Sequence, residues 1–168
     1  DGGTSLFAQS RYGLNGKTFQ CYKLRSMPVD AQERLNAILA TNDALRAEWE
    51  ASQKLRSDPR ITPLGSLLRK SSIDELPQLW NVLKGDMSIV GPRPIVKNEI
   101  QKYGDNYRFY TAVRPGLTGL WQVDGRTNTT YEERIEMDVN YVRTRSFWGD
   151  VWIMLKTVPA VLRSRGAV

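Results

Sequence analysis

A change in the spacing of apolar residues near Asp30 most constrains the fold of this chain. Before it, residues 5–9 and 18–24 are typical of two short strands, and Asn15-Gly16 between them is a common signal of a tight hairpin turn. From Asp30 onward, apolar residues recur at helical spacing between turns that contain glycine or proline. The sequence therefore predicts a mostly helical α+β fold with one small antiparallel β-hairpin.

Local signals mark the ends of the expected helices. Asp30 with Glu33, and Thr130 with Glu133, have the spacing of a capping box at a helix start. Gly85 is a suitable residue just beyond a helix end. We expect helices over residues 30–49 with a break near 41–43, and over residues 63–70, 74–83, 96–103, from Thr130 onward, and 147–163.

The length of 168 residues suits one domain with a modest core and is short for two, so we expect residues 1–168 to form a single domain. No apolar run approaches the roughly 20 residues needed to span a bilayer. The chain starts at Asp1-Gly2-Gly3 rather than at Met, which leads us to expect a further N-terminal segment ahead of it.

Composition narrows the chemistry. The chain has no histidine, which excludes Ser-His-Asp and Cys-His triads, HExxH zinc sites and histidine bases, and leaves carboxylates, Lys, Arg, Tyr and a hard metal ion. A net charge of +6 favours phosphate groups, acidic lipid surfaces or nucleic acid as partners, although a solvated basic surface is the alternative. Cys21 is the single cysteine, so no intrachain disulfide can form, and we expect it to be buried in a strand.

The pair Asp74-Glu75 is the strongest candidate for catalysis. Pro77 has no N–H and is tolerated in a first helical turn, which places Asp74 at or beside the N-cap and Glu75 just inside the helix. The positive end of the helix dipole there favours ionised carboxylates. One acid could attack phosphorus while its neighbour ligates Mg²⁺. Acidic residues are also routine helix caps, and the pair alone does not decide between these alternatives.

Basic residues accompany this pair. Guanidinium groups bind phosphate bidentately, and those in stiff or glycine-containing turns lose little entropy on binding. The candidates for a phosphate pocket are Arg69, Arg93, Arg114 and Arg126, together with Lys23 and Arg25, which lie two apart on one face of a predicted strand. Ordinary solvated cations are the alternative for each of them.

Two further features are ambiguous. Asp138 lies on a helical stripe with Ile135, Val139 and Val142, so its carboxylate needs a partner. It either orients an active-site Arg or Lys or closes a structural salt bridge. The last helix combines tryptophans, aliphatic residues and basic residues, which suits either the headgroup region of a membrane or a buried core.

Several motifs resemble one protein family. Residues 71–94, with Asp74-Glu75-Leu76-Pro77 and Gly91-Pro92-Arg93-Pro94, resemble the signature of the bacterial sugar transferase family, the monotopic phosphoglycosyl transferases. Residues 22–27 resemble its upstream basic motif, and residues 114–123 and 138–142 resemble two later motifs. The insertion over residues 31–58 is most similar to the large branch that includes undecaprenyl-phosphate galactose phosphotransferases.

The resemblance implies a two-step reaction. Asp74 attacks the β-phosphate of a UDP-sugar and releases UMP, and the phosphosugar then passes to undecaprenyl phosphate, the first membrane step of polysaccharide assembly. It implies Mg²⁺ bound by Glu75 with Asp74. The set it implies for binding phosphate or nucleotide is Lys23, Arg25, Arg69, Arg93, Pro94, Arg114, Gln122, Arg126, Asp138 and Tyr141.

The resemblance also implies a place in the cell. It predicts the cytoplasmic face of the bacterial inner membrane, an N-terminal re-entrant membrane helix ahead of this chain, no nucleic-acid partner, and room for a homodimer. Two other functional classes stay open from the residues alone. One is a basic helical module that binds nucleic acid, and the other is a membrane-surface domain without catalysis.

Overall fold

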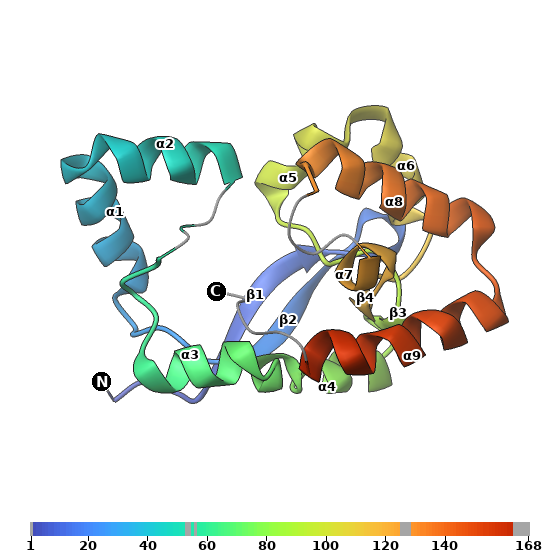
Figure 1. The fold of residues 1–168 in the computed structure, drawn as a ribbon, viewed down its shortest axis with the longest axis horizontal. Helices are drawn as coiled ribbons and strands as arrows, with labels where there is room; N and C mark the ends of the chain where they lie inside the picture. Colours follow the sequence, from blue (N-terminus) through green and yellow to red (C-terminus); the bar gives the residue numbers. More distant parts are fainter. Residues whose placement is uncertain (1, 53–54, 56, 125–128, 163–168) are drawn as a thin grey trace.

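The computed structural model describes residues 2–52, 55, 57–124 and 129–162 (Figure 1). The predicted hairpin is confirmed: β1 (Leu6–Tyr12) pairs antiparallel with β2 (Thr18–Leu24) in a register that runs from Leu6↔Leu24 to Tyr12↔Thr18. The turn is the 3₁₀ segment η1 (Leu14–Gly16), where Asn15 and Gly16 have φ of 56° and 70°. Both values lie in the left-handed region that Asn and Gly adopt most readily.

Helices make up most of the remaining chain, as predicted. The helices N-terminal to Lys84 are α1 (Ala31–Thr41), α2 (Asp43–Ser52), α3 (Pro63–Lys70), η2 (Ile73–Glu75) and α4 (Gln78–Leu83). The helices C-terminal to Lys84 are α5 (Lys97–Tyr103), η3 (Gly104–Asn106), α6 (Tyr107–Thr111), α7 (Leu120–Asp124), α8 (Tyr131–Thr144) and α9 (Phe147–Leu162). The break at 41–43 and the capping box of Thr130 and Glu133 are confirmed.

Two local predictions were wrong. The Asp30 side chain does not cap α1, because its carboxylate instead accepts hydrogen bonds from Arg34 Nε, each 2.9 Å long. Residues 74–83 do not form one helix either. Glu75 N donates to Ser72 O and Leu76 N donates to Ile73 O in a 3₁₀ pattern, and Pro77 has no N–H to continue it, so α4 begins only at Gln78.

A short parallel pair, β3 (Ser88–Val90) with β4 (Gly116–Thr118), lies inside the molecule and was not predicted. Both α4 and α9 pack on this pair. Two apolar clusters form the core around it. One contains Ile95, Tyr103, Tyr110 and Ile135, and the other contains Val90, Tyr141 and Ile153.

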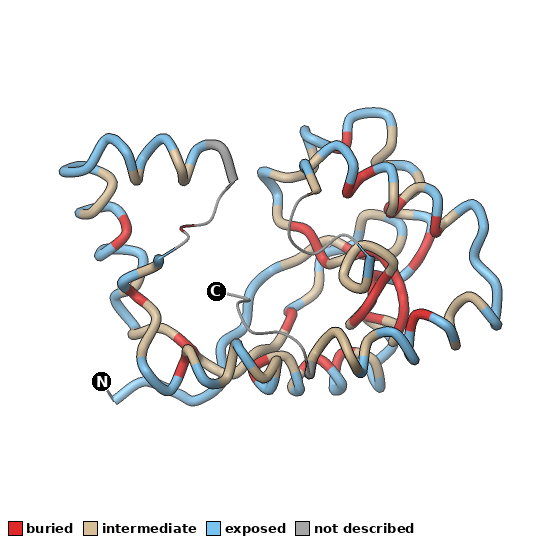
Figure 2. The backbone as a smooth tube through the Cα atoms, viewed as in Figure 1, coloured by how far each residue is buried: buried red, intermediate tan, exposed pale blue. Residues whose placement is uncertain are grey.

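The arrangement leaves two regions exposed. Helices α1 and α2 form an arm at one side of the molecule, and most of its backbone is exposed (Figures 1 and 2). Helices α3, α4 and α9 run along another edge in the same view. In the described residues no helix combines the length and the apolar character that crossing a membrane requires.

Candidate active site

The Asp74-Glu75 pair lies in η2, between α3 and α4, where η2 packs against both α3 and β2. Ser72 enters this turn with a left-handed φ of 56°, which redirects the chain after α3. Asn81 of α4 then fixes the helix on β2: its amide donates to Gln20 O at 2.7 Å and accepts from Tyr22 N at 3.1 Å. Asn81 is fully buried, so these bonds hold η2 and α4 on the hairpin.

Glu75 faces the hairpin and is paired with Lys23. Lys23 Nζ donates to Glu75 Oε1 at 2.6 Å. Burial by itself would raise the pKa of Glu75, but the charges of Lys23 and Arg93 and hydrogen bonds from Lys23 and Gln78 outweigh it and lower that pKa. Glu75 is therefore a carboxylate at neutral pH, as a metal ligand must be.

Asp74 is more enclosed than its neighbour. It is 7% exposed, and burial raises its pKa, although the charges of Lys23 and Arg69 act in the opposite direction. Arg69 sits in the last turn of α3, which Thr62 caps by accepting from Gly65 N. Arg69 Nε donates to Ser26 Oγ at 2.9 Å, and this bond holds the guanidinium beside η2.

Arg93 approaches from a loop whose backbone is bonded on both sides. Pro92 O accepts from Gly116 N at 2.8 Å, and Pro94 O accepts from Arg11 Nη1 at 3.1 Å. The Arg93 guanidinium lies 5.9 Å from the centre of the Trp121 ring, and its charge lowers the pKa of Glu75. The predicted stiffness of this loop is thus achieved by hydrogen bonds as well as by its prolines.

These contacts gather five of the predicted residues into what we call the phosphate cluster: Lys23, Arg69, Asp74, Glu75 and Arg93. Three cations and two carboxylates give it a formal charge of +1. Mg²⁺ commonly binds one or two carboxylates and takes its other ligands from water and substrate phosphates. The cluster fits such an ion only in part, because Lys23 already occupies Glu75 Oε1 and the described residues contain no group of three His, Cys, Asp or Glu around a common point.

Other predicted residues lie elsewhere. Arg25 follows the end of β2 and donates through Nη2 to Thr4 Oγ1 at 3.1 Å, so it and Lys23 take different partners. Arg114 Nε donates to Gly85 O at 2.7 Å, beyond the opposite end of α4 from Asp74. Arg114 and Tyr141 line a separate cavity of about 530 Å³, where the Tyr141 hydroxyl donates to Asp150 Oδ1 at 2.9 Å.

Two more predicted residues lie outside the phosphate cluster, and one is not described. Gln122 is half-buried in α7, and a Cβ on Gly119 would lie 2.8 Å from its Oε1. Pro94 contributes the carbonyl that binds Arg11. Arg126 lies outside the described residues.

Asp138 has a partner that was not foreseen. Among the residues that the structure describes, neither a lysine nor an arginine pairs with it directly, and Tyr103 Oη donates to Asp138 Oδ2 at 2.6 Å in the core. Asp138 is 3% exposed, and burial raises its pKa to about 6 despite that hydrogen bond and the charge of Arg134. The carboxylate is thus buried in the core, with the Tyr103 hydroxyl as its hydrogen-bond donor.

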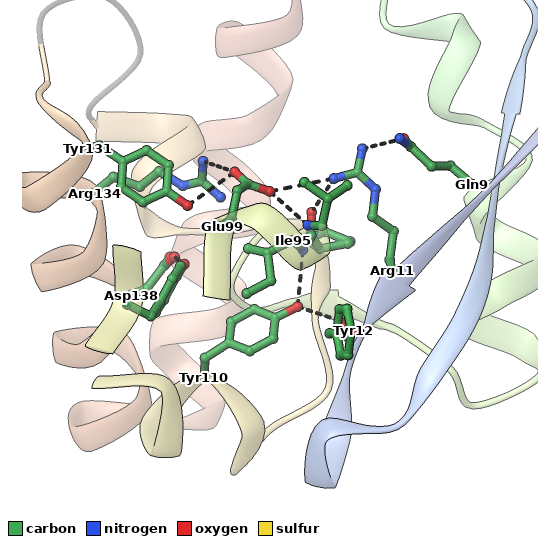
Figure 3. Close-up of polar contacts among 12 residues, drawn as sticks. Gln9, Arg11, Tyr12, Ile95, Glu99, Tyr110, Tyr131, Arg134 and Asp138 are labelled. Carbon is green, nitrogen blue, oxygen red and sulfur yellow. Dashed lines mark hydrogen bonds and ion pairs between the residues drawn. The ribbon is translucent and has the colours of Figure 1, made fainter. Parts of the chain in front are cut away.

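A polar network that was not predicted from the sequence surrounds the Arg93 loop (Figure 3). Its members come from β1, α5, α6, α8 and the loop before α5, and Glu99 lies between Arg11 and Arg134 in it. Glu99 stands three residues after Val96, the spacing of a helix cap, which is the one local signal that could have found it. The hydrogen bond from Arg11 Nη2 to Gln9 Oε1 joins residues two apart, and the remaining contacts join residues too far apart in sequence to leave a local pattern.

Comparison with known proteins agrees with the motifs. The model of a family described as bacterial sugar transferase matches residues 1–164. An undecaprenyl-phosphate galactose phosphotransferase of Salmonella typhimurium is 51% identical over 99% of this chain and 35% of its own length. A UDP-galactose-lipid carrier transferase of Erwinia amylovora is 47% identical, also over 99% of this chain and 35% of its own length.

A shorter relative is similar over most of its length. The exopolysaccharide production protein ExoY of Sinorhizobium fredii is 47% identical over 99% of this chain and 74% of the relative. The chain therefore spans about a third of the first two relatives and about three quarters of the third. With a family match that covers nearly every residue, this chain belongs to the bacterial sugar transferase family.

Proposed function

We propose that this chain is the catalytic part of an enzyme that transfers a hexose 1-phosphate from a UDP-sugar to undecaprenyl phosphate. The names of two relatives support these substrates, since one names undecaprenyl phosphate and galactose and the other names UDP-galactose and a lipid carrier. One observation carries the proposal: a nearly buried carboxylate, Asp74, lies beside the positive charges of Lys23 and Arg69. The reaction would be the first membrane step of polysaccharide assembly.

The chemistry proceeds in two displacements at phosphorus. An Asp74 oxygen attacks the β-phosphorus of the UDP-sugar, the bond from that phosphorus to the bridging oxygen breaks, and UMP leaves with the electron pair. An oxygen of the polyprenyl phosphate then attacks the same phosphorus and displaces the Asp74 carboxylate. Lys23, Arg69 and Arg93 neutralise the diphosphate, so that negative charge developing on UMP is stabilised.

Mg²⁺ is part of this proposal. Glu75 and Asp74 would hold it, with phosphate oxygens as further ligands, and the ion would stabilise phosphate charge as a Lewis acid. Lys23 holds Glu75 in place and lowers its pKa, which keeps the carboxylate deprotonated as a metal ligand would have to be. A raised pKa at Asp74 leaves a more basic and hence more nucleophilic carboxylate than an exposed aspartate.

The acceptor is a lipid, and the edge formed by α3, α4 and α9 suits a membrane surface. Exposed large apolar side chains on and between these helices include Leu64, Leu67, Leu76, Leu79, Trp80, Leu83, Phe147, Trp148, Trp152, Leu155 and Val158. Apolar side chains exposed in such number on neighbouring helices favour an interfacial position. We propose that this edge rests on the cytoplasmic face of the inner membrane. Asp74 lies in η2, between α3 and α4, two of the helices that form the edge.

The test is Asp74→Asn in the full-length chain in membranes. Asparagine keeps the size of the side chain and loses the nucleophilic charge, so UMP release from UDP-galactose or UDP-glucose should fall at least about a thousandfold. Asp43→Asn, on the exposed arm, is the matched control and should keep wild-type activity. Turnover by Asp74→Asn at the wild-type rate would remove the nucleophile assignment.

Mass spectrometry provides a second reading. Intact protein incubated with the UDP-sugar in the absence of the lipid acceptor should gain the mass of one phosphosugar. Peptide mapping should place this adduct on Asp74. The Asp74→Asn protein should gain nothing. An adduct on another residue would show that Asp74 is not the nucleophile, although the two-step transfer reaction itself would still be supported.

A further inference from the structure

Trp121 and Arg134 connect the phosphate cluster to the interior of the protein. Within the described part of the chain, the Arg93 guanidinium donates no hydrogen bond and forms no ion pair, and its contact is the Trp121 ring at 5.9 Å. The Arg134 guanidinium lies 4.8 Å from the centre of the same ring. One indole is therefore shared by two cations, of which only Arg93 belongs to the phosphate cluster.

Arg134 is itself held rigidly. It is 7% exposed, and its guanidinium also lies 5.1 Å from the Tyr131 ring. Arg134 Nη1 is 3.5 Å from Glu99 Oε1, while Nε and Nη2 have no hydrogen-bond acceptor among the described residues. Cation–π contacts with two rings, together with the negative charges of Glu99 and Asp138, compensate for burying this charge.

Glu99 joins Arg134 to the backbone of the Arg93 loop (Figure 3). Glu99 Oε2 accepts from Val96 N at 2.8 Å, and Glu99 Oε1 accepts from Tyr131 Oη at 3.1 Å. On its other side Glu99 lies 3.8 Å from Arg11, which binds Pro94 O. The loop backbone and the Trp121 ring thus share one support, so neither moves freely relative to the other.

We propose that Trp121 and Arg134 are positioning residues that hold the Arg93 guanidinium toward the diphosphate of the nucleotide sugar. This inference rests on the proposed function. A free arginine side chain loses considerable rotamer entropy when it binds phosphate, and a ring already beneath the guanidinium removes part of that loss. Arg134 keeps the ring in place from the interior.

The role predicts energetic coupling, which a double-mutant cycle measures. In the full-length chain, Trp121→Leu should lower kcat/KM for the UDP-sugar by roughly 3- to 30-fold, the range expected for a cation–π contact. In an Arg93→Ala background the same substitution should change kcat/KM less than twofold, because its effect passes through Arg93. Trp121→Phe, which keeps an aromatic face, should recover most of the activity.

Phe109 provides a matched control. It is half-buried like Trp121 and lies beneath two arginines, Arg143 at 4.6 Å and Arg108 at 4.9 Å, which do not belong to the phosphate cluster. Phe109→Leu should have the same small effect with and without Arg93. A Trp121→Leu effect that is equally large in both backgrounds would overturn the inference.

A binding readout separates this inference from the proposed function. UDP binding measured by calorimetry should weaken in Trp121→Leu and in Arg134→Met, again only when Arg93 is present, and Arg134→Lys should weaken it less. A full-length protein that shows this dependence of UDP binding on Arg93 and yet releases no UMP from UDP-sugars would refute the transfer reaction. That result would still support the positioning role of Trp121 and Arg134. If Trp121→Leu fails to fold, the cycle of Arg134→Met with Arg93→Ala decides, and additive effects there contradict the proposal.

Discussion

Asp74 and Glu75 are neighbours in one turn, yet their surroundings shift their pKa values in opposite directions. Asp74 is the more enclosed residue, and burial raises its pKa. Glu75 gains Lys23 at 2.6 Å and the charge of Arg93, which lower its pKa. The same pair of residue types is thus divided into a more basic carboxylate and a stably ionised one, which suits a nucleophile beside a metal ligand.

Asp138 provides a prediction at the same scale. Its pKa is raised to about 6 in the folded state, whereas an unfolded aspartate titrates near 3.9. The folded state therefore binds the proton more tightly, and between those two pH values this group makes the protein less stable as pH rises. The loss amounts to roughly 3 kcal/mol when the group is fully ionised, by the conversion of 1.36 kcal/mol per pKa unit.

Asp138→Asn should remove this contribution. Asparagine can still accept from Tyr103 through Oδ1 and carries no charge, so the mutant should lose less stability than wild type between pH 4 and 7. Urea unfolding at a series of pH values measures the difference, and Asp105→Asn, an exposed acid in η3, is the control. Parallel stability curves for wild type and Asp138→Asn would contradict the raised pKa.

At the scale of elements, the parallel pair β3–β4 exists because glycines let two backbones approach closely. A Cβ on Gly116 would lie 2.1 Å from Gly91 N and 2.4 Å from Thr118 O, distances that only a backbone shift could relieve. Gly91 N donates to Thr118 O, and Gly116 N donates to Pro92 O. This approach fixes the start of the Arg93 loop relative to β4, and thereby the position of the phosphate cluster.

Gly116→Ala should therefore be costly. We expect a loss of at least roughly 1–3 kcal/mol in the free energy of unfolding, the usual range for overpacking in a closely packed interior. Gly149→Ala in α9, where the nearest atom is a side-chain oxygen at 3.1 Å, should have a much smaller effect. Thermal or urea unfolding compares the two variants. Equal losses of stability would show that the close backbone approach at Gly116 does not require a glycine.

At the scale of the whole molecule, exposed apolar side chains and the phosphate cluster meet around η2 and α4. Leu76 is 54% exposed and Leu83 is 79% exposed, and the former directly follows the Asp74-Glu75 pair. A polyprenyl phosphate has an apolar chain and an anionic end, so an acceptor lying in a membrane can present its phosphate to the cluster without leaving the lipid. The position of Asp74 is consistent with such an acceptor.

A labelling experiment tests this orientation in the full-length chain. Cys21 is buried, so once accessible cysteines outside residues 1–168 are replaced, a cysteine introduced by Leu83→Cys can be labelled selectively with an environment-sensitive fluorophore. We expect its emission to shift to the blue in anionic vesicles and to be quenched by nitroxide lipids. Ala44→Cys, at an exposed position of α2 in the arm away from this edge, is the control and should respond weakly (Figure 1). Equal responses at both positions would refute the proposed membrane-facing edge.

Much of the local structure could be predicted because its causes lie within a few residues. The Asn15-Gly16 turn, the helix over residues 63–70, the capping box at Thr130 and the glycine after α4 each depend on contacts of short sequence separation. The two wrong local predictions also have local causes. The Asp30 carboxylate accepts from the Arg34 side chain instead of from the backbone of α1, and Pro77 divides a predicted helix into η2 and α4.

The sequence by itself determined the family, the mostly helical α+β class and the residue types that can handle phosphate without histidine. Only the tertiary structure decided which of those residues meet. It paired Lys23 with Glu75 across 52 residues and gave Asp138 the Tyr103 hydroxyl as its partner, and it placed Arg114 by Gly85 at the other end of α4 from Asp74. The reason is physical: partners distant in sequence are chosen by how helices and strands pack, and that packing leaves no periodic signal in the chain.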